Sequence, residues 1–383
     1  MLQPSVILSR QNFHHNLELL LKASKAKNLI PVLKADAYGH GLLGVLEQLK
    51  LAQSLDLREQ ISMVSLARVE ELKRIFLENK DTVCQFEYLI LSFFSEKDLH
   101  WIVDSKLIDR VVLVINNKNS LELILSLKLP FRIHINLNTG MNRLGFLIEE
   151  FEVLKEKIKE SPLLLQGLMT HFAEADNINN DFTQQQIQKF SQIKNTKLLR
   201  HVENSSALCR DDLELSIEAQ RVGLLLFGLF PAESDRQSWL DKIGKDSDLK
   251  PVLQMRAPLN HVFKVKKGDS VGYGCDWVAQ KETTLATVSL GYADGVPRHY
   301  DFKDGRLGFY VLNHLCPVVG RVSMDLTVID LGEHPLLEEL NNSNEFAYWI
   351  HEKQDANLIA QELKTINYDV LCSIGHRLPR LWQ

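Results

Sequence analysis

Lys34 is the residue whose type and surroundings point most clearly to chemistry. It follows the apolar pair Val32-Leu33 and precedes the glycine-containing turn Tyr38-Gly39-His40-Gly41. Burial at the end of an apolar strand would lower the pKa of this lysine, because removing an ammonium group from water costs free energy. The neutral amine is the form that condenses with a carbonyl group. A lone lysine more often lays its alkyl chain on apolar surface and keeps its charge in water, so the neighbouring residues must decide.

The elements that would position Lys34 alternate regularly along the first part of the chain. Short apolar runs predict strands at Ile30–Lys34, Ser62–Leu66, Tyr88–Ser92, Arg110–Ile115, Arg132–Leu137, Leu164–Thr170, Leu198–Glu203 and Val222–Phe227. Segments of helical period between them include Leu42–Lys50, Val69–Glu78, Leu121–Leu127, Ile148–Lys159 and Phe182–Ile193. This alternation predicts an α/β fold with a parallel (β/α)8 TIM-like barrel, whose active site forms after the C-terminal ends of the strands.

The pattern changes in the second part of the chain. The segment Ala232–Lys250 is polar, charged and poor in periodic pattern. Beyond it, strand-like runs at Met255–Val265, Thr283–Leu290, Leu307–Leu312, Pro317–Val322 and Thr327–Leu331 predict a mostly antiparallel β domain, with one late helix at Ala356–Thr365. We expect a barrel over residues 1–240, whose first residues could instead pack with the β domain, and a β-rich C-terminal domain over residues 241–383. Residues 335–346 predict a surface loop.

Composition and charge exclude several classes of function. The length of 383 residues favours two domains, and the formal net charge of −5 argues against a nucleic-acid surface, which needs clustered Lys and Arg. No run reaches the roughly 18 apolar residues of a membrane span, and the N-terminus lacks the pattern of a secretory signal. The five cysteines are scattered without a CxxC pair. They predict reduced thiols in a cytoplasmic protein, with neither disulfides nor a metal site.

The ten residues Val32–Gly41 resemble the cofactor-lysine motif of the alanine racemases, which are fold-type III pyridoxal-phosphate enzymes. The likeness continues in the same order at Asn138–Gly145, His171–Ala173, Asn204–Ser205, Arg221–Leu224, Gly272–Gly274, Gly291–Gly295, Arg321–Asp325 and Tyr368. This resemblance implies interconversion of L-alanine and D-alanine, either to supply D-alanine for peptidoglycan or to allow alanine catabolism.

The resemblance also assigns the residues that would hold pyridoxal 5'-phosphate (PLP). Lys34 would carry the cofactor, and its phosphate would be bound by Tyr38, Ser205, Gly223, Leu224 and Tyr368. A phosphate needs backbone N–H groups and hydroxyls, although Ser205 alone could equally be a helix N-cap. Arg221 would face the pyridine nitrogen. Because a guanidinium keeps its proton near neutral pH, that nitrogen would stay largely unprotonated, which gives the weaker electron sink that suits a racemase.

Racemisation requires a base on each face of the substrate's α-carbon. The resemblance makes Lys34 one base and Tyr273 the other, with Tyr273 supplied by the partner subunit. The implied protein is therefore a homodimer with shared active sites. A free phenol has a pKa of about 10 and is a poor base at neutral pH. In the family, His171 with Arg221 behind it supports this tyrosine.

The remaining assignments concern the substrate. Arg143 is expected to contact its carboxylate and the cofactor's phenolic oxygen, Met324 would approach the carboxylate through its backbone N–H, and Tyr292 would help to close the site across the dimer. The corridor that leads to the site would be lined by Asp176, Arg298, Arg321 and Ile366. Asp176 could equally be a solvated loop acid, and Arg298 a turn arginine.

Asn136 is the informative departure from the family. Many members have a carbamylated lysine at this position, seven residues before Arg143, and its negative charge orients the arginine. An Asn amide has no charge, although its carbonyl oxygen can accept a hydrogen bond. We hypothesise that Asn136, together with a bound anion such as chloride, holds Arg143. A smaller departure is Val222, where the family often has proline.

Three alternatives remain open from the sequence. The protein could be a racemase of serine or of another small amino acid. It could be a non-enzymatic PLP-binding homeostasis protein, but such proteins consist of a single barrel and would leave residues 251–383 unexplained. It could also be a barrel enzyme that uses no PLP.

Overall fold

The computed structural model describes residues 3–52, 61–194, 197–202, 204–213, 217–302, 305–332 and 345–383. The chain forms two compact units. The barrel unit comprises Phe13–Lys250, and the β unit comprises Met1–Asn12 with Pro251–Gln383. The chain passes from the β unit to the barrel unit within α1 (Arg10–Ala23). Within the described ranges, no helix is both long enough and apolar enough to span a membrane.

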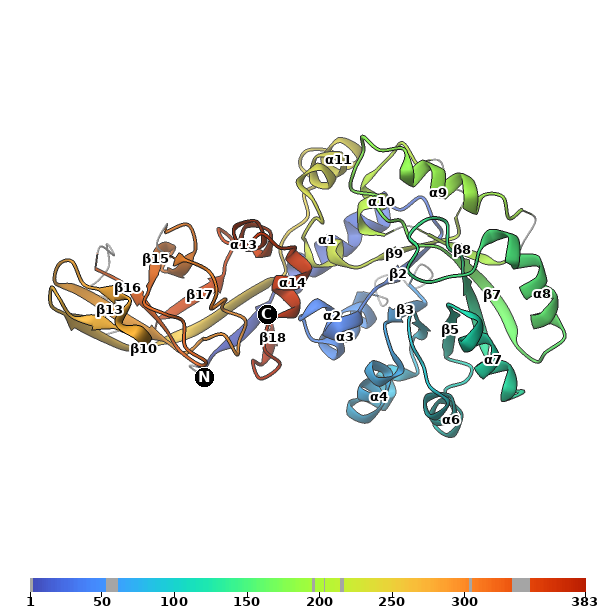
Figure 1. The fold of residues 1–383 in the computed structure, drawn as a ribbon, viewed down its shortest axis with the longest axis horizontal. Coiled ribbons are helices and arrows are strands. Elements are labelled where there is room, and N and C mark those ends of the chain that lie inside the picture. The colour runs from blue at the N-terminus through green and yellow to red at the C-terminus, as the bar shows by residue number, and fades with distance from the viewer. Residues whose placement is uncertain are drawn as a thin grey trace. The chain divides into compact units, whose positions relative to one another are not determined.

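Eight parallel strands form the sheet of the barrel unit, in the order β2-β9-β8-β7-β6-β5-β4-β3 (Figure 1). They are β2 (Asn28–Pro31), β3 (Met63–Leu66), β4 (Glu87–Ile90), β5 (Val111–Ile115), β6 (Arg132–Asn136), β7 (Leu164–Met169), β8 (Leu199–His201) and β9 (Ala219–Val222). A parallel bridge between Val32 and Ser65 joins the two ends of this order. The sheet is therefore a nearly closed barrel, which confirms the predicted fold class, and Lys34 lies directly after the closing bridge.

Helices connect these strands and cover the outside of the sheet, as Figure 1 shows for α4, α6, α7 and α8. The helical segments after α1 are α2 (Lys34–Tyr38), α3 (Leu42–Ala52), α4 (Val69–Glu78), α5 (Lys80–Val83), α6 (Glu96–Asp104), α7 (Lys118–Ser126), η3 (Ile148–Glu150), α8 (Phe151–Lys159), α9 (Phe182–Phe190), α10 (Ser205–Cys209), η4 (Leu224–Phe227) and α11 (Glu233–Ile243). Their apolar spacing explains the packing: α4 buries Val69, Leu72 and Ile75 on one side. Each such burial stabilises the fold by about 1.5–3 kcal/mol.

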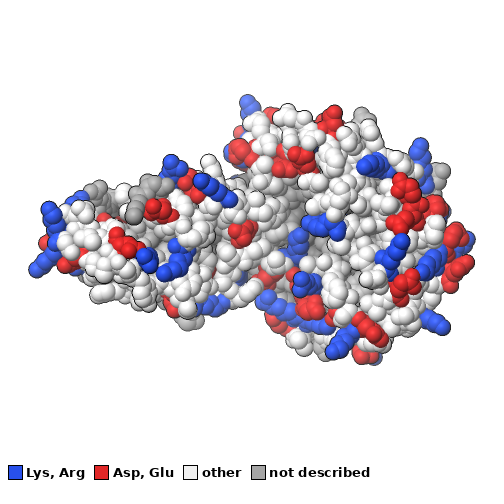
Figure 2. All heavy atoms as spheres, viewed as in Figure 1, with Lys and Arg blue, Asp and Glu red and all other residues white. Residues whose placement is uncertain are grey.

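The core of the barrel is apolar. All five residues of β5 are buried, as expected for a parallel strand covered on both faces. A buried cluster that includes Ile30, Val112 and Met169 takes residues from β2, β3, β4, β5, β7 and β9. Acidic and basic side chains are intermixed over the face of the barrel unit that Figure 2 shows. This rigid, apolar sheet is what fixes the residues at its C-terminal edge.

The eighth strand differs from its prediction. It was expected at Val222–Phe227, but β9 ends at Val222 and the apolar run after it forms the 3-10 helix η4. The sequence pattern did not predict this strand because its centre consists of Gln220 and Arg221, two polar residues that are buried here. A short apolar run such as Leu224–Phe227 cannot be assigned to strand or helix from its pattern.

A helix also lies where no periodic element was expected. α11 occupies part of the polar segment Ala232–Lys250 and belongs to the barrel unit, which extends to Lys250. It is anchored by Trp239, which is fully buried and donates its indole N–H to the Ser247 carbonyl at 2.9 Å. Asp235 accepts a hydrogen bond from Ser206 at 2.8 Å. These few buried residues hold a helix whose remaining positions are mostly polar.

The β unit contains an eight-stranded sheet in the order β13-β16-β15-β14-β17-β10-β1-β18, and an added β13–β10 pairing closes six of the strands into a ring. Its strands are β1 (Ser5–Leu8), β10 (Leu253–Val265), β13 (Thr283–Val288), β14 (Gly308–Val311), β15 (His314–Val319), β16 (Thr327–Asp330), β17 (Phe346–Ile350) and β18 (Arg380–Trp382). The pairings are antiparallel except for β1 with β18. This confirms a mostly antiparallel C-terminal domain.

Shorter elements complete the β unit. They are β11 (Ser270–Val271), η5 (Tyr273–Cys275), β12 (Trp277–Val278), α13 (Ala356–Leu363) and α14 (Asn367–Cys372). α13 corresponds to the predicted late helix, whereas β1, β17, β18 and α14 had not been predicted. The loop predicted at 335–346 lies outside the described residues up to position 344, and Phe346 already begins β17. The end of the predicted strand Leu198–Glu203, at position 203, also lies outside them.

Candidate active site

Lys34 begins a left-handed turn. Ala35, Asp36, Ala37 and Tyr38 have φ values of 54°, 55°, 54° and 52°. Left-handed backbone costs a non-glycine residue about 1–2 kcal/mol, so other contacts must hold this turn. The side chains at its two ends differ in exposure: Lys34 is exposed, whereas Tyr38 is buried. We expected Lys34 to end a buried strand. The strand instead ends at Pro31.

Two carboxylates hold the turn in place, one from α4 and one from the turn itself. Glu71 of α4 accepts the Ala35 N–H at 2.7 Å. Asp36 accepts the Leu42 N–H at 2.9 Å and forms an ion pair of 2.9 Å with Arg74. Charged acceptors make stronger hydrogen bonds than neutral ones. The barrel therefore supports the strained backbone on which Lys34 is mounted.

Arg221, on β9, is the buried cation of the site, with only 3% of its surface exposed. Its Nη1 donates to the His201 carbonyl at 2.6 Å and lies 2.8 Å from His201 Nδ1. Its Nη2 donates to the Thr170 carbonyl at 2.8 Å and lies 3.4 Å from His171 Nδ1. A guanidinium is only a donor, so acceptors from the ends of β7 and β8 fix its plane at the C-terminal edge of the barrel.

His171, just after β7, is surrounded by cations. Burial and then the charges of Arg221, Arg143 and Lys34 lower the pKa of His171 to about 3. The ring is therefore neutral near pH 7. Because Nδ1 faces the Arg221 donor, the single ring proton belongs on Nε2. The barrel thus brings four predicted residues together: Lys34, Arg143, His171 and Arg221.

Tyr38, Ser205 and Gly223 form a second group. The Gly223 N–H donates to Ser205 Oγ at 3.3 Å. A Cβ at position 223 would lie only 2.4 Å from the Tyr38 hydroxyl oxygen, so glycine lets this hydroxyl approach the backbone. Ser205 is not the N-cap of α10, because Asn204 is the cap and accepts the Ala207 N–H at 3.1 Å. Two hydroxyls beside an N–H-rich turn are the donor set that suits a phosphate.

Arg143 lies on the segment that follows β6, and its side chain is exposed. Asn136 donates its amide to Asn116 Oδ1 at 2.8 Å. Among the hydrogen bonds of the described residues there is none between Asn136 and Arg143. The Asn136 amide therefore hydrogen-bonds Asn116 and not Arg143 in this structure, and what orients Arg143, including the expected anion, stays a prediction.

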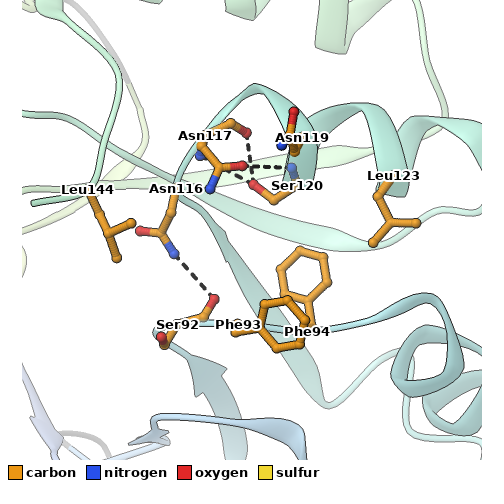
Figure 3. Close-up of a pocket in the computed structure, with 9 residues that line it drawn as sticks. All are labelled: Ser92, Phe93, Phe94, Asn116, Asn117, Asn119, Ser120, Leu123 and Leu144. Carbon is orange, nitrogen blue, oxygen red and sulfur yellow. Dashed lines mark hydrogen bonds between the residues drawn. The ribbon is translucent and has the colours of Figure 1, made fainter.

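Asn116, at the end of β5, links this segment to its surroundings. Its side-chain amide donates to the Leu91, Ser92 and Val114 carbonyls at 3.0, 3.3 and 3.2 Å. Its backbone carbonyl accepts the Gly145 N–H at 2.9 Å. Figure 3 shows the adjoining pocket, of about 280 Å³, with the Asn116 amide directed at Ser92. Its lining residues are Ser92, Phe93, Phe94, Asn116, Asn117, Asn119, Ser120, Leu123 and Leu144. The pocket contains none of the predicted site residues, although Leu144 is next to Arg143 in the chain.

The β unit carries the other predicted residues. Tyr273 lies in η5 between Gly272 and Gly274, both with left-handed φ, and 67% of its surface is exposed. Met324 and Ile366 are also exposed, at 53% and 61%. Tyr292 is exposed and Tyr368, on α14, is half-buried.

The two arginines predicted to line the corridor have local partners. Arg298 donates to the Val322 carbonyl at 2.5 Å and lies over the Tyr292 ring at 5.6 Å. Arg321 forms an ion pair with Asp276. Asp176, in the barrel unit, is exposed, and its charge helps to raise the pKa of Asp235.

Sequence reasoning missed three polar residues behind the site: Asn116, His134 and His201. His134 and His201 lie on strands of the barrel, on β6 and β8, and Asn116 directly follows β5. The available signal was a buried polar residue in or beside an apolar strand, such as His134 between Ile133 and Ile135. Buried polar groups need partners, so such residues are candidates for supporting contacts.

Comparisons with known proteins agree with this geometry. The family models described as "Alanine racemase, N-terminal domain" and "Alanine racemase, C-terminal domain" match residues 8–231 and 252–382. The chain is 30% identical to the alanine racemase of Vesicomyosocius okutanii subsp. Calyptogena okutanii over 374 residues, 97% of each protein. It is 31% identical to that of Listeria monocytogenes serotype 4a over 369 residues, 92% of this chain and 90% of the relative.

Solved structures give the same result. The alanine racemase from Acinetobacter baumannii matches with a TM-score of 0.79 and 27% identity over 100% of both chains. The biosynthetic alanine racemase from Pseudomonas aeruginosa matches with a TM-score of 0.80 and 25% identity, also over 100% of both chains. Since both halves and nearly the full length are matched, the chain belongs to the alanine racemase family.

Proposed function

We propose that this protein is a PLP-dependent racemase that interconverts L-alanine and D-alanine, with Lys34 and Tyr273 as its two bases. The observation that supports it best is the convergence of Lys34, Arg143 and Arg221 on a neutral His171 at the C-terminal edge of the barrel. Three cations around one neutral imidazole suit an anionic cofactor and a substrate with a carboxylate. The product would supply D-alanine for peptidoglycan or enter alanine catabolism.

The residues of the barrel unit fit PLP. Lys34 would attach the cofactor, and Tyr38, Ser205, Gly223 and Leu224 would hold its phosphate, together with Tyr368 of the β unit. The close approach of the Tyr38 hydroxyl to Gly223 supports this assignment. Arg221 would donate toward the pyridine nitrogen and keep it unprotonated. When bound, PLP supplies an electron sink that acidifies the substrate's α-carbon.

The two bases would act on opposite faces of that carbon. The Lys34 amine would take the α-proton on one face, and the Tyr273 hydroxyl would deliver a proton on the other, with the roles exchanged for the opposite enantiomer. The Nε2–H of His171 would donate to the Tyr273 oxygen and thereby favour its phenolate form. The lysine and the tyrosine belong to different units. In the proposed assembly Tyr273 comes from a partner subunit of a homodimer, and its exposed surface supports this.

Arg143 would bind the substrate carboxylate, helped by the Met324 backbone N–H, and Tyr292 would close the site. Serine or another small amino acid is the nearest alternative substrate. A PLP-binding homeostasis protein is a weaker candidate, because the match to the C-terminal domain covers residues 252–382. We place the protein in the cytoplasm, since its cysteines suit a reducing compartment.

The test is to supply PLP to the purified protein and follow the loss of optical activity from L-alanine and from D-alanine by circular dichroism. Lys34→Ala and Tyr273→Phe should each abolish the exchange. Tyr310→Phe, which removes a hydroxyl from a tyrosine of β14 in the same unit, is the matched control and should keep it. Borohydride reduction should label Lys34, and sedimentation should give a dimer. A protein that binds PLP but leaves both enantiomers unchanged would refute the proposal. Faster turnover of serine than of alanine would make serine the preferred substrate instead.

A further inference from the structure

Two histidines continue inward from Arg221 through the interior of the barrel. His201 Nδ1 lies 2.8 Å from Arg221 Nη1, and His201 Nε2 lies 2.8 Å from His134 Nδ1. His201 and His134 are 0% and 1% exposed. The chain of contacts therefore runs from β9 to β8 and on to β6, without an exposed member.

The always-charged guanidinium determines the proton positions along this chain. Arg221 can only donate, so His201 Nδ1 must accept. The single proton of a neutral His201 ring then sits on Nε2 and is donated to His134 Nδ1. His134 in turn carries its proton on Nε2. Burial and the charges of Arg132 and Arg221 lower the pKa of His134 to about 3. Burial, Arg221 and His134 lower that of His201 as well, so both rings stay neutral.

A glycine on the intervening strand makes the contact between the histidines possible. β7 lies between β6 and β8, and Gly167 pairs with His134 in register. A Cβ at position 167 would lie 2.6–2.8 Å from three atoms of the His134 ring. The ring therefore lies across the bare backbone of β7 and reaches His201 on the far side.

The far nitrogen of His134 also has a suitable environment. His134 lines a cavity of about 160 Å³ whose polar lining includes Ser62, Glu87 and Gln166. A cavity of this size and polarity can hold water, and water accepts an N–H. A water molecule there would give the His134 Nε2 proton its acceptor.

We propose that His134 is a positioning residue of the active site, which locks the His201 tautomer that presents Nδ1 to Arg221. Arg221 is thereby held with its other nitrogen toward His171. If His134 did not accept the Nε2 proton, His201 could adopt the opposite tautomer, whose Nδ1–H would face an Arg221 N–H. The tautomer assignment concerns the protein alone. Only the effect on the cofactor rests on the proposed function.

The direct test is a long-range ¹H–¹⁵N spectrum of the ¹⁵N-histidine-labelled full chain without added PLP, because protonated and unprotonated ring nitrogens have well-separated ¹⁵N shifts. We expect protons on Nε2 of both His201 and His134, unchanged over about pH 5 to 9. A proton on His201 Nδ1, or a doubly protonated ring in this range, would overturn the proposal. This result depends neither on a variant that folds nor on the proposed reaction.

Two variants separate positioning from core packing. In the His134→Asn variant, the amide Oδ1 can occupy the position of the ring Nδ1 and accept the His201 proton. In the His134→Leu variant, the leucine side chain is similar in shape to asparagine but has no acceptor. We expect the PLP dissociation constant to rise at least tenfold in the Leu variant and less than threefold in the Asn variant. The Leu variant should also give a mixture of His201 tautomers. Equal PLP dissociation constants in the two variants, both with native thermal unfolding, would overturn the proposal.

If His134→Leu does not fold, Gly167→Ala replaces it. The added Cβ displaces the His134 ring but leaves both imidazoles in the chain. We expect it to shift the His201 tautomer and to weaken PLP binding in the same direction. Unchanged tautomers with unchanged PLP affinity in a folded Gly167→Ala protein would count against the role of His134.

Discussion

Gly223→Ala tests the phosphate site that we propose for Tyr38, Ser205 and Gly223. The new Cβ would lie 2.4 Å from the Tyr38 hydroxyl oxygen and 2.9 and 3.0 Å from two of its ring carbons. Ordinary contact requires about 3.5 Å, so the tyrosine must move by roughly 1 Å. Tyr38 is buried and its backbone is held in the left-handed turn, which leaves the side chain little freedom to yield.

The expected loss has two parts. Overpacking a buried site costs about 1–3 kcal/mol of unfolding free energy. Displacing the Tyr38 hydroxyl would also remove the charge-assisted hydrogen bond that we propose it makes to the cofactor phosphate, worth about 1.5–3 kcal/mol. The second part corresponds to a roughly 12- to 140-fold rise in the PLP dissociation constant. Gly223 itself has φ −115°, so alanine adds no left-handed strain to the comparison.

The assay is a PLP titration of the apoprotein together with urea unfolding of each variant. Tyr38→Phe serves as the partner in a double-mutant cycle, because it removes the closest atom of the collision. The loss in the double variant should be smaller than the sum of the two single losses. A Gly223→Ala protein with wild-type PLP affinity, or strictly additive losses, would refute the reasoning.

Four further predictions follow. Tyr273→Phe should lower racemisation by at least about 100-fold while PLP still attaches to Lys34, and substantial remaining turnover would remove Tyr273 from its role. Since the pKa of His171 is lowered to about 3, an NMR titration should show this ring neutral above about pH 5, and protonation near pH 6.5 would contradict the cation cluster. Burial raises the pKa of Asp235 to about 6. The folded state therefore holds a proton that the unfolded state has already released, and the unfolding free energy should fall by up to about 3 kcal/mol between roughly pH 4 and pH 6. Asp235→Asn should remove that fall in urea unfolding, and an unchanged pH profile would exclude Asp235 as its source. If an anion orients Arg143, removal of chloride should raise the KM for alanine more than it lowers kcat, and kinetics independent of chloride would exclude that role.

Local pattern was enough for the barrel and for its motif. β5 consists of five buried apolar residues, and α4 was predicted with its observed bounds, Val69–Glu78, because its apolar residues recur at helical spacing. Both signals arise within one element. The resemblance around Lys34 likewise lies in a contiguous run of residues.

Other elements depend on distant partners. β9 was misplaced because Gln220 and Arg221 are buried polar residues, and only pairing with β2 and β8 makes them part of a strand. The left-handed turn after Lys34 was unforeseen, since it is supported by Glu71 and by Arg74 from α4. No local propensity predicts a backbone that a distant carboxylate stabilises.

From the sequence alone came the class of the barrel, the antiparallel second domain, the lysine and the identities of the residues that would work with it. The fold class rests on periodicity, whereas the lysine and its partner residues rest on the resemblance of short motifs to a known family; each segment carries both signals by itself. Only the tertiary structure decided that His171 is neutral, that Asn136 contacts Asn116 rather than Arg143, and that His134 reaches His201 over Gly167. Burial, proton position and hydrogen-bond partners belong to pairs of residues far apart in the chain. The fold that brings those residues together therefore sets them.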